Sequence, residues 1–569
     1  MGKFWVMMVM LLGSLRASTQ TLDVDNQSIA YNDLIESYRA LADKHNDARL
    51  YTMGQTDCGK PLHLFIIADT AKGKIELTPE FLRDKVVMLV NNGIHAGESC
   101  GIDASLQFCK RLLKSAIPSN VVYALIPVYN VGGMLNRGSF SRANQNGPHE
   151  HGFRGNARHL DLNRDFVKAD ALNTHSFYEI FHLLKPHIFV DTHTSNGANY
   201  QYTITLISSQ KDKLNPVLAD YMRQDIEPYL YQKMNGSGWE MVPYVNGVGA
   251  TPNEGFTAFL ETPRFSSGYA AQFNTMSFIT ETHMLKPFKD RVASTLTFLQ
   301  AMSSFCETKR LEILKAKQQA SALDAELLEY EINWSLDTTE SRSIDFKGYE
   351  FSYEPSKIWD GDRLKYHDDK PTTFATKYWE NYKATHRATT PQYYVLPQAW
   401  REVVARLRQN SVEMVQLEKD SLMLVNNYYL KNPVFSNGPY EGHFLIKDIQ
   451  TEVAEGYRKF SKGDFLVPVN QTNKRFLISV LEPLAVDSYL RWNFFDEVFQ
   501  QKEHFSPYVF EETAMHLLKE NTELKKEFED WKKAHPAKAK NAYTALNFIY
   551  KRSAYYEKEH LLYPVARVE

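Results

Sequence analysis

The sequence predicts an α/β fold with a mixed, mostly parallel sheet flanked by helices, followed by a β-rich region and a helical C-terminus. Three observations support this. Between residues 30 and 305, short apolar runs alternate with segments whose apolar residues recur with the periodicity of a helix. Beyond residue 340 the chain becomes rich in tyrosine and phenylalanine with alternating patterns, and helical periodicity returns after residue 505. At 569 residues the chain has room for several domains of roughly 150 residues each.

The first region supplies the strands and helices of the predicted sheet. Its apolar runs are bounded by turn residues and have the length of buried strands. Since helical segments separate them, we expect crossover connections and parallel pairing. We predict strands at 62–68, 86–91, 123–127, 188–191, 257–260 and 277–280, and helices at 100–113, 169–184 and 287–304. The domain that they form is predicted to span residues 20–306.

The second half is predicted to contain three further segments. Residues 308–330 are polar and favour a helix, so 307–340 is interpreted as a helical linker. Residues 341–505 show alternation such as Phe444 with Ile446, which indicates a β-rich accessory domain. Residues 506–569 are predicted to be helical, with helices at 511–519, 524–534 and 542–551. Because no Gly/Ser linker separates the regions, we expect the accessory domain to pack against the first.

The N-terminus has the parts of a secretory signal peptide. One lysine precedes an apolar run at 4–15, and small residues follow it. The run is shorter than the ~20 residues that span a bilayer, so we expect cleavage near residue 19 and no stable membrane span afterwards. The protein is therefore expected to be exported, to the periplasm or beyond the cell. The net charge of −3 and the lack of a basic run argue against a nucleic-acid partner.

Two strand ends carry residues that suit a metal ion. The buried run at 86–91 leads through a glycine-containing turn to His95 and Glu98, and the run at 188–191 ends near His193. Ligands of open α/β sheets gather at the carboxyl ends of the strands. His187 lies before its strand and would point from the opposite edge. Two histidines and one glutamate form a catalytic zinc set, with a fourth position left for water.

A third motif lies between these ligands in the sequence. The segment Asp161-Leu-Asn163-Arg164, together with His95-Ala-Gly-Glu98, resembles the zinc carboxypeptidase family, and in particular its large bacterial exported members. The resemblance covers residues 30–305 and implies a carboxypeptidase A-like sheet of the eight-stranded type. It also implies that one Zn²⁺ ion is bound. On this resemblance Asn163 and Arg164 hold the terminal carboxylate of a substrate, and Asp161 orients a ligating imidazole.

The resemblance implies a catalytic arginine and a catalytic glutamate, and the sequence offers rivals for each. Arg154, nine residues before Asn163, is the preferred oxyanion-stabilising arginine, with Arg142, Arg137 and Arg158 as alternatives. Glu281 is the preferred general base because it ends an apolar strand just before the last helix of the domain. Glu261 also ends such a run and is its rival.

The family also has a tyrosine that caps the bound substrate. Tyr269 is the chosen candidate, and Tyr244 is the alternative.

These residues together predict a zinc-dependent exopeptidase that acts on peptides with a free C-terminus. Two other functions stay open at this point. A zinc amidase or deacylase acting on small N-acyl amino acids or peptidoglycan peptides would need the same carboxylate-binding pair. A non-catalytic envelope binding protein would depend mainly on the accessory region.

Overall fold

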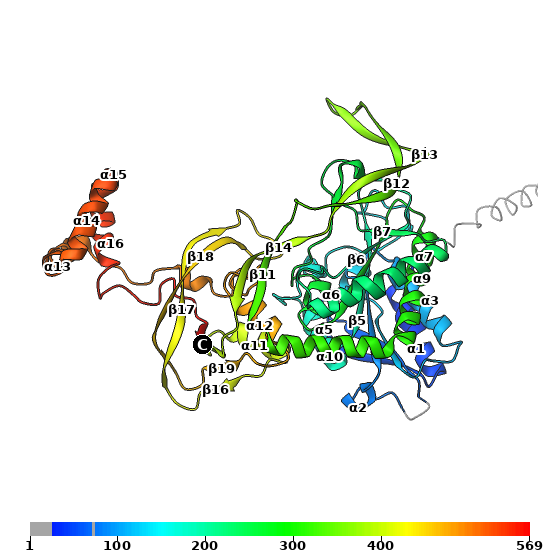
Figure 1. Cartoon of the computed structure of the whole chain (residues 1–569), viewed down its shortest axis with the longest axis horizontal. Coiled ribbons are helices and arrows are strands. Elements are labelled where there is room, and N and C mark those ends of the chain that lie inside the picture. The colour runs from blue at the N-terminus through cyan, green and yellow to red at the C-terminus, as the bar shows by residue number, and fades with distance from the viewer. Residues whose placement is uncertain (1–25, 71–73) are drawn as a thin grey trace, which may run out of the picture.

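The computed structural model describes residues 26–70 and 74–569, and it places the two halves of the chain side by side (Figure 1). The predicted signal peptide at 1–19 lies outside the described residues. Within the described ranges, no helix is both long enough and apolar enough to cross a membrane.

An eight-stranded mixed sheet forms the centre of the N-terminal half, in the strand order β1-β2-β4-β3-β5-β10-β6-β7. The pairs β3–β4, β3–β5, β5–β10 and β6–β7 are parallel, and the pairs β1–β2, β2–β4 and β10–β6 are antiparallel. The predicted fold class is therefore confirmed. The strands are β1 (Ala48–Gln55), β2 (Pro61–Ile67), β3 (Val86–Asn92), β4 (Val121–Ile126), β5 (Ile188–Ser195), β6 (Ile204–Ser208), β7 (Met241–Pro243) and β10 (Met276–His283).

Helices cover both faces of this sheet, because its central strands are apolar on both sides. In β3, Val86, Met88 and Val90 pack into one core and Val87 and Leu89 into the other. This is the alternation that a strand buried on both faces requires. The first core is closed by α1 (Tyr31–Lys44), α3 (Cys100–Leu112), α7 (Glu227–Gly236), α9 (Phe288–Thr308) and α10 (Arg310–Glu326), and the second by α5 (Leu172–Leu184) and α8 (Ser266–Ala271).

The strand predicted at 257–260 does not belong to this sheet. Only β9 (Phe256–Thr257) forms there, and it pairs with β8 (Asn246–Gly247) and with β13 (Asp362–Trp379) from the second half of the chain. The apolar residues of this run pack against aromatic residues of the hairpin formed by β12 (Arg342–Pro355) and β13. A short apolar run can pack equally well in the eight-stranded sheet or against the β12–β13 hairpin, so the sequence alone does not predict which of the two it joins.

The second half departs from its predicted boundaries in two places. The linker helix α10 ends at Glu326, and β11 (Glu329–Leu336) follows and pairs with β14 (Tyr382–Thr389). The C-terminal segment is not wholly helical, since β20 (Ala566–Val568) returns to the accessory sheet. Its pairing partners lie about 140 to 175 residues earlier in the chain, and a contact so distant leaves no local pattern.

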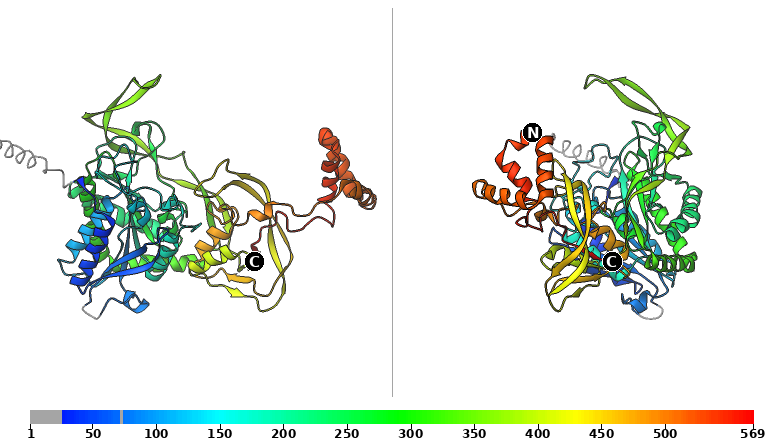
Figure 2. Two further views of the ribbon diagram at one scale, coloured as in Figure 1. Left: turned by 180° about the vertical axis from the view of Figure 1, so that it is seen from behind. Right: turned by 60° about the vertical axis from the view of Figure 1, so that its left-hand side comes forward.

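The accessory sheet has six strands in the order β16-β19-β15-β20-β17-β18. Its strands are β15 (Tyr393–Leu396), β16 (Val415–Gln416), β17 (Ser421–Phe435), β18 (Ile446–Phe460), β19 (Phe465–Pro468) and β20, with α11 (Arg401–Gln409) and α12 (Lys474–Leu481) beside them. The helices α13 (Pro507–Glu520), α14 (Thr522–Ala534), α15 (Pro536–Ala539) and α16 (Ala542–Tyr550) lie apart from this sheet, on two extended connections (Figure 2). They have a small core of their own.

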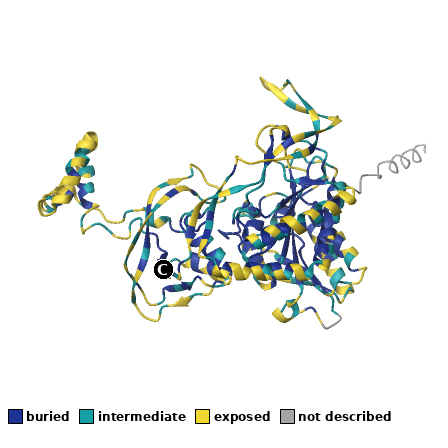
Figure 3. Ribbon diagram, viewed as in Figure 1, coloured by how far each residue is buried: buried dark blue, intermediate teal, exposed yellow. Residues whose placement is uncertain are grey.

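The accessory sheet packs firmly on the N-terminal half, as expected. One hydrophobic core runs from β2 and α5 to α12 and the buried Trp492. Burial is continuous across this junction, whereas the α13–α16 helices are mostly exposed (Figure 3). The junction also contains the ion pair between Arg264 and Asp487, with 2.7 Å between Nε and Oδ1. All four cysteines are free thiols.

Candidate metal centre

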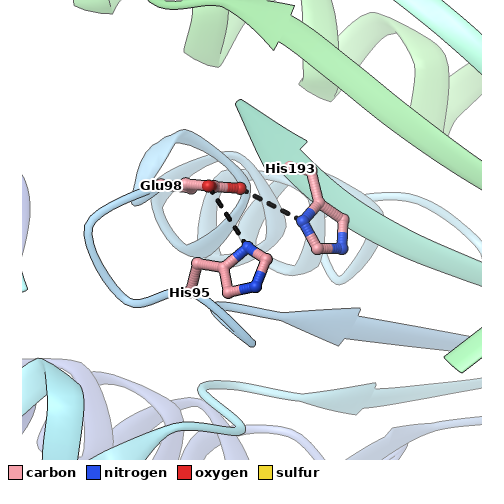
Figure 4. Close-up of side chains that lie close together, drawn as sticks. All are labelled: His95, Glu98 and His193. Carbon is pink, nitrogen blue, oxygen red and sulfur yellow. Dashed lines mark hydrogen bonds and ion pairs between the residues drawn. The ribbon is translucent and has the colours of Figure 1, made fainter. Parts of the chain in front are cut away.

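The three predicted metal ligands come together at the carboxyl ends of β3 and β5. His95 and Glu98 lie in the turn between β3 and α3, and His193 lies on β5. All three are buried, and they offer ligand atoms that lie within 4.8 Å of one another. Glu98 lies between the two imidazoles (Figure 4). One carboxylate oxygen is 3.2 Å from His95 Nδ1, and the other is 3.1 Å from His193 Nδ1.

An aspartate stands behind each imidazole. His95 Nε2 lies 3.0 Å from Asp161 Oδ1, and His193 Nε2 lies 3.1 Å from Asp191 Oδ2. Both rings therefore present Nδ1 to the centre and Nε2 to a carboxylate. A hydrogen bond to a carboxylate, which His95 makes to Asp161, fixes the tautomer and orientation of a metal-ligating histidine. Asp191 stands at ion-pair distance from the corresponding nitrogen of His193.

The donor set fits a zinc ion. Two imidazole nitrogens and a carboxylate are a zinc ligand set. His95 Nδ1 is buried and makes no hydrogen bond to any described residue, so it is available to a metal. Burial lowers the pKa of His193, but the charge of Asp191 and the hydrogen bond to Glu98 outweigh this and raise the pKa well above its ordinary value. The site therefore favours positive charge, which a metal ion can supply in place of a proton.

The structure distinguishes the two candidate glutamates. Glu281 on β10 is paired in register with His193 on β5, which brings it to the centre. Burial, together with the nearby charge of Glu98, raises the pKa of Glu281 to about 7. Glu261 is instead held in a buried ion pair, 2.7 Å from Lys213 Nζ, and accepts a hydrogen bond from the Gln210 backbone.

Two of the four candidate arginines reach the centre. Arg154 donates to Asp161 Oδ2 over 3.1 Å from Nε and 2.8 Å from Nη2, and its Nη1 lies 3.6 Å from Glu98. Arg142 lies 3.1 Å from Glu98 and also donates to the Thr194 carbonyl. The side chain of Arg154 is 46% exposed and that of Arg142 only 12%, so Arg154 is the more open to a substrate.

The other two arginines bond elsewhere. Arg137 donates to the Ser28 and Ile29 carbonyls, and Arg158 donates to the Asp170 carbonyl.

The predicted substrate-binding pair lies directly after Asp161. The Asn163 backbone N–H donates to Asp161 Oδ1, and the Asn163 side-chain oxygen accepts from the Ser266 backbone. The Arg164 guanidinium lies over the ring of Phe265, 4.4 Å from its centroid. Asn163 is buried and Arg164 is partly exposed. The Asn163 side chain is therefore held inside the protein, and the Arg164 side chain is accessible to solvent.

Tyr269 is not at the site, contrary to its predicted role. It is fully buried and stacks on Tyr178, and its hydroxyl donates to Asn410. A side chain packed in an aromatic core cannot swing over a substrate. Tyr244, the alternative, is nearer: burial and the charges of Glu281 and Glu98 raise its pKa.

Sequence reasoning missed Asp191 and the accessory residues that reach this region. Asp191 could have been found, because it lies two residues before His193 and therefore faces the same side of the strand. Tyr440 and Glu441 approach from the accessory sheet, with Tyr440 bonded to Arg164 and Glu441 to the Asp161 backbone. No local pattern indicates so distant a contact.

Comparison with known proteins relates part of the chain to a family. Residues 34–235 match the family model described as zinc carboxypeptidase. Similar solved structures include a metallo-carboxypeptidase from Burkholderia cenocepacia, with 15% identity over 50% of this chain and 70% of that one and a TM-score of 0.37. Another is the carboxypeptidase A from Helicoverpa armigera, with 14% identity over 53% and 75% and a TM-score of 0.34.

A further similar structure is a Pseudomonas aeruginosa metallo-carboxypeptidase in complex with (2-guanidinoethylmercapto)succinic acid, with 12% identity over 50% and 68% and a TM-score of 0.36. Comparison with curated proteins gives no match. The matched residues include His95, Glu98, the Asp161–Arg164 motif and His193. Through residues 34–235 the chain carries a domain that matches the zinc carboxypeptidase family.

Proposed function

We propose that this protein removes C-terminal residues from peptides, with one zinc ion held by His95, Glu98 and His193. The observation that carries the proposal is the position of Asp161. Its carboxylate contacts both the ligating His95 and the exposed Arg154, and the chain continues from it into Asn163 and Arg164. Asp161 thus links a proposed metal ligand to the proposed carboxylate-binding pair.

Each side chain has a role that its position supports. A zinc ion held by His95, Glu98 and His193 would lower the pKa of its bound water and would polarise the scissile carbonyl. Glu281 accepts the proton of the attacking water on its carboxylate and delivers it to the leaving amine. Arg154 stabilises the oxyanion with its guanidinium.

The terminal carboxylate binds to Asn163 and Arg164. The guanidinium fork matches a carboxylate in geometry and charge. A substrate held at its own C-terminus presents its last peptide bond to the centre, and this makes the enzyme an exopeptidase.

Replacement of Glu281 tests the proposal most directly. Glu281→Gln removes the proton acceptor but none of the three ligands, so kcat should fall by roughly 10²- to 10⁴-fold while bound zinc stays stoichiometric. Activity is measured on N-acylated dipeptides, and metal content by elemental analysis. Glu312→Gln, on the exposed face of α10, is the matched control. Unchanged turnover in Glu281→Gln would remove Glu281 from the mechanism.

A zinc amidase acting on small N-acyl amino acids uses the same carboxylate pair and is the second candidate. A panel of free-acid peptides, their C-terminal amides and N-acetyl amino acids separates the two activities. Cleavage of N-acetyl amino acids alone would favour the amidase. Stoichiometric zinc without hydrolysis of any member would favour a binding protein of the cell envelope.

We also propose that residues 1–19 direct export and are then removed. N-terminal sequencing of protein recovered from the periplasm or medium tests this. Recovery of the intact N-terminus from the cytoplasm alone would contradict it.

A further inference from the structure

The connection between β17 and β18 brings the accessory sheet to the proposed substrate site. Its tip, Tyr440-Glu441-Gly442-His443, is a two-residue turn. The Tyr440 N–H donates to the His443 carbonyl over 2.7 Å, and the His443 N–H donates to the Tyr440 carbonyl over 3.0 Å. Glu441 and Gly442 have φ of 50° and 86°. Two consecutive positive φ values are typical of a type I′ turn, whose twist suits a hairpin.

This turn contacts the catalytic half at two adjacent points. The Tyr440 hydroxyl accepts a hydrogen bond from Arg164 Nε over 3.0 Å. Glu441 Oε2 accepts one from the Asp161 backbone N–H over 2.7 Å. Since Asp161 in turn contacts His95, the tip of the accessory hairpin lies only two contacts from a metal ligand.

The turn is supported from behind by buried groups. The Tyr440 ring stacks on Trp492, with 6.2 Å between centroids and 29° between planes, and Trp492 is fully buried. Arg264 lies over Trp492 at 4.9 Å and is fixed by its ion pair with Asp487. On the other side, His443 Nε2 lies 2.8 Å from Asp170 Oδ2. Tyr440 is therefore held in one position, although 37% of it is exposed.

The chemistry of the phenol suits it to bind a substrate here. The Tyr440 oxygen already accepts from Arg164, so its own proton remains available to donate. A guanidinium and a hydroxyl donor side by side match the two oxygens of a carboxylate. We propose that Tyr440 completes the binding site for the substrate's terminal carboxylate, so that the accessory half forms part of the active site. This inference rests on the proposed exopeptidase function.

The test is Tyr440→Phe, which removes one hydroxyl and keeps the stacked ring. We expect KM for an N-acylated dipeptide with a free carboxylate to rise roughly 10- to 100-fold, because a hydrogen bond to a charged group is lost. The kcat should change little, and the slow hydrolysis of the matching C-terminal amide should not change. Tyr457→Phe, an exposed tyrosine on β18 of the same sheet, is the matched control.

Substitutions of Glu441 test whether its hydrogen bond to Asp161 holds Tyr440 in position. Glu441→Gln keeps an oxygen acceptor for the Asp161 N–H and should retain the wild-type KM. Glu441→Ala removes the acceptor and should raise KM for the free acid in the direction of Tyr440→Phe. Equal effects of the two substitutions would show that the anchor is not this hydrogen bond.

Three outcomes for Tyr440→Phe would overturn the proposal. These are an unchanged KM, an equal loss of activity on the free acid and on the amide, and a rise in activity, which would mean that the turn excludes substrate.

Binding provides a readout that does not need turnover. In the Glu281→Gln background, calorimetry should show that the free-acid peptide binds 10- to 100-fold more weakly after Tyr440→Phe. If wild type binds but never cleaves, the proposed function fails, and calorimetry still decides the role of Tyr440.

Discussion

At the scale of single residues, the centre depends on carboxylates that stand behind the two histidines proposed as metal ligands. Asp161 serves His95 and Asp191 serves His193. Asp191 is itself fixed, because it accepts a hydrogen bond of 2.5 Å from Ser266 and lies 3.4 Å from the Asn91 side-chain nitrogen. A carboxylate so constrained can hold an imidazole in one orientation, and the geometry of the ligands then does not have to be created when the metal binds.

Asp191→Asn is therefore expected to weaken zinc binding by roughly 10- to 100-fold, since the amide holds the His193 ring less firmly and reduces its basicity. Competition with a chromophoric chelator measures the affinity. Asp225→Asn, at an exposed position before α7, is the control. Wild-type zinc affinity in Asp191→Asn would mean that Asp191 does not support the ligand.

The residue types of the site were predictable, and their partners were not. His95, Glu98, Asp161 and His193 follow strand ends or a motif, which are local patterns. The misplaced Tyr269 shows the limit, because the sequence around a tyrosine gives no sign of whether its side chain faces the metal centre or the aromatic core. Tyr440 is 276 residues from its partner Arg164, a distance that sequence periodicity does not bridge.

At the scale of elements, the site depends on how closely α3 approaches β5. Gly101 lies in the first turn of α3, and a Cβ atom there would lie 1.9 Å from Thr192 Oγ1 and 2.3 Å from Thr192 Cβ. Thr192 immediately precedes His193. The helix that follows Glu98 can therefore sit against the strand that carries His193 only because residue 101 has no side chain.

Gly101→Ala is expected to lower the free energy of unfolding by about 1–3 kcal/mol, because α3 must move away from β5. The same movement should weaken zinc binding. Gly236→Ala is a matched control, since Gly236 is also helical and a Cβ there meets nothing within 4 Å. We expect that substitution to be neutral or stabilising. Denaturant unfolding of both variants checks this, and equal stability of the two would contradict the close approach.

Strands buried on both faces were the most predictable elements. The core strands β3, β4 and β5 lie within a few residues of their predicted limits, because continuous apolar runs between turn residues leave few alternatives. The edge strand β7 is only three residues long and was missed. The run near residue 257 was assigned to the wrong sheet, since its partner comes from β13 more than 100 residues later.

At the scale of the whole molecule, the two halves are joined beside the proposed carboxylate site. Asp170 of the catalytic half is at the centre of this junction. It contacts His443 at 2.8 Å and Arg406 at 3.2 Å from the accessory half, and Lys168 at 2.9 Å from its own. Arg406 Nε also donates to the Lys168 carbonyl. The junction that fixes Tyr440 thus has ion pairs at its edge and apolar side chains at its centre.

This junction should respond to acid in a defined direction. Burial alone would raise the pKa of Asp170. The hydrogen bond from His443 and the charge of Lys168 outweigh this and hold the pKa well below its usual range. A carboxyl group whose pKa is lowered by folding stabilises the fold above its unfolded pKa of about 3.9, and this contribution is lost as the pH falls below that value.

Asp170→Asn should therefore lower the free energy of unfolding by on the order of 3 kcal/mol at pH 7, where it leaves Lys168, His443 and Arg406 without their shared partner. The deficit should shrink as the pH is lowered through 4 and below, because the unfolded wild-type chain then takes up a proton on Asp170 that the folded protein does not, and this favours unfolding. Thermal unfolding between pH 3 and pH 7 measures the difference, with Asp225→Asn as a control expected to follow wild type throughout. A deficit that stayed constant down to pH 3 would show that Asp170 acts through packing and not through its charge.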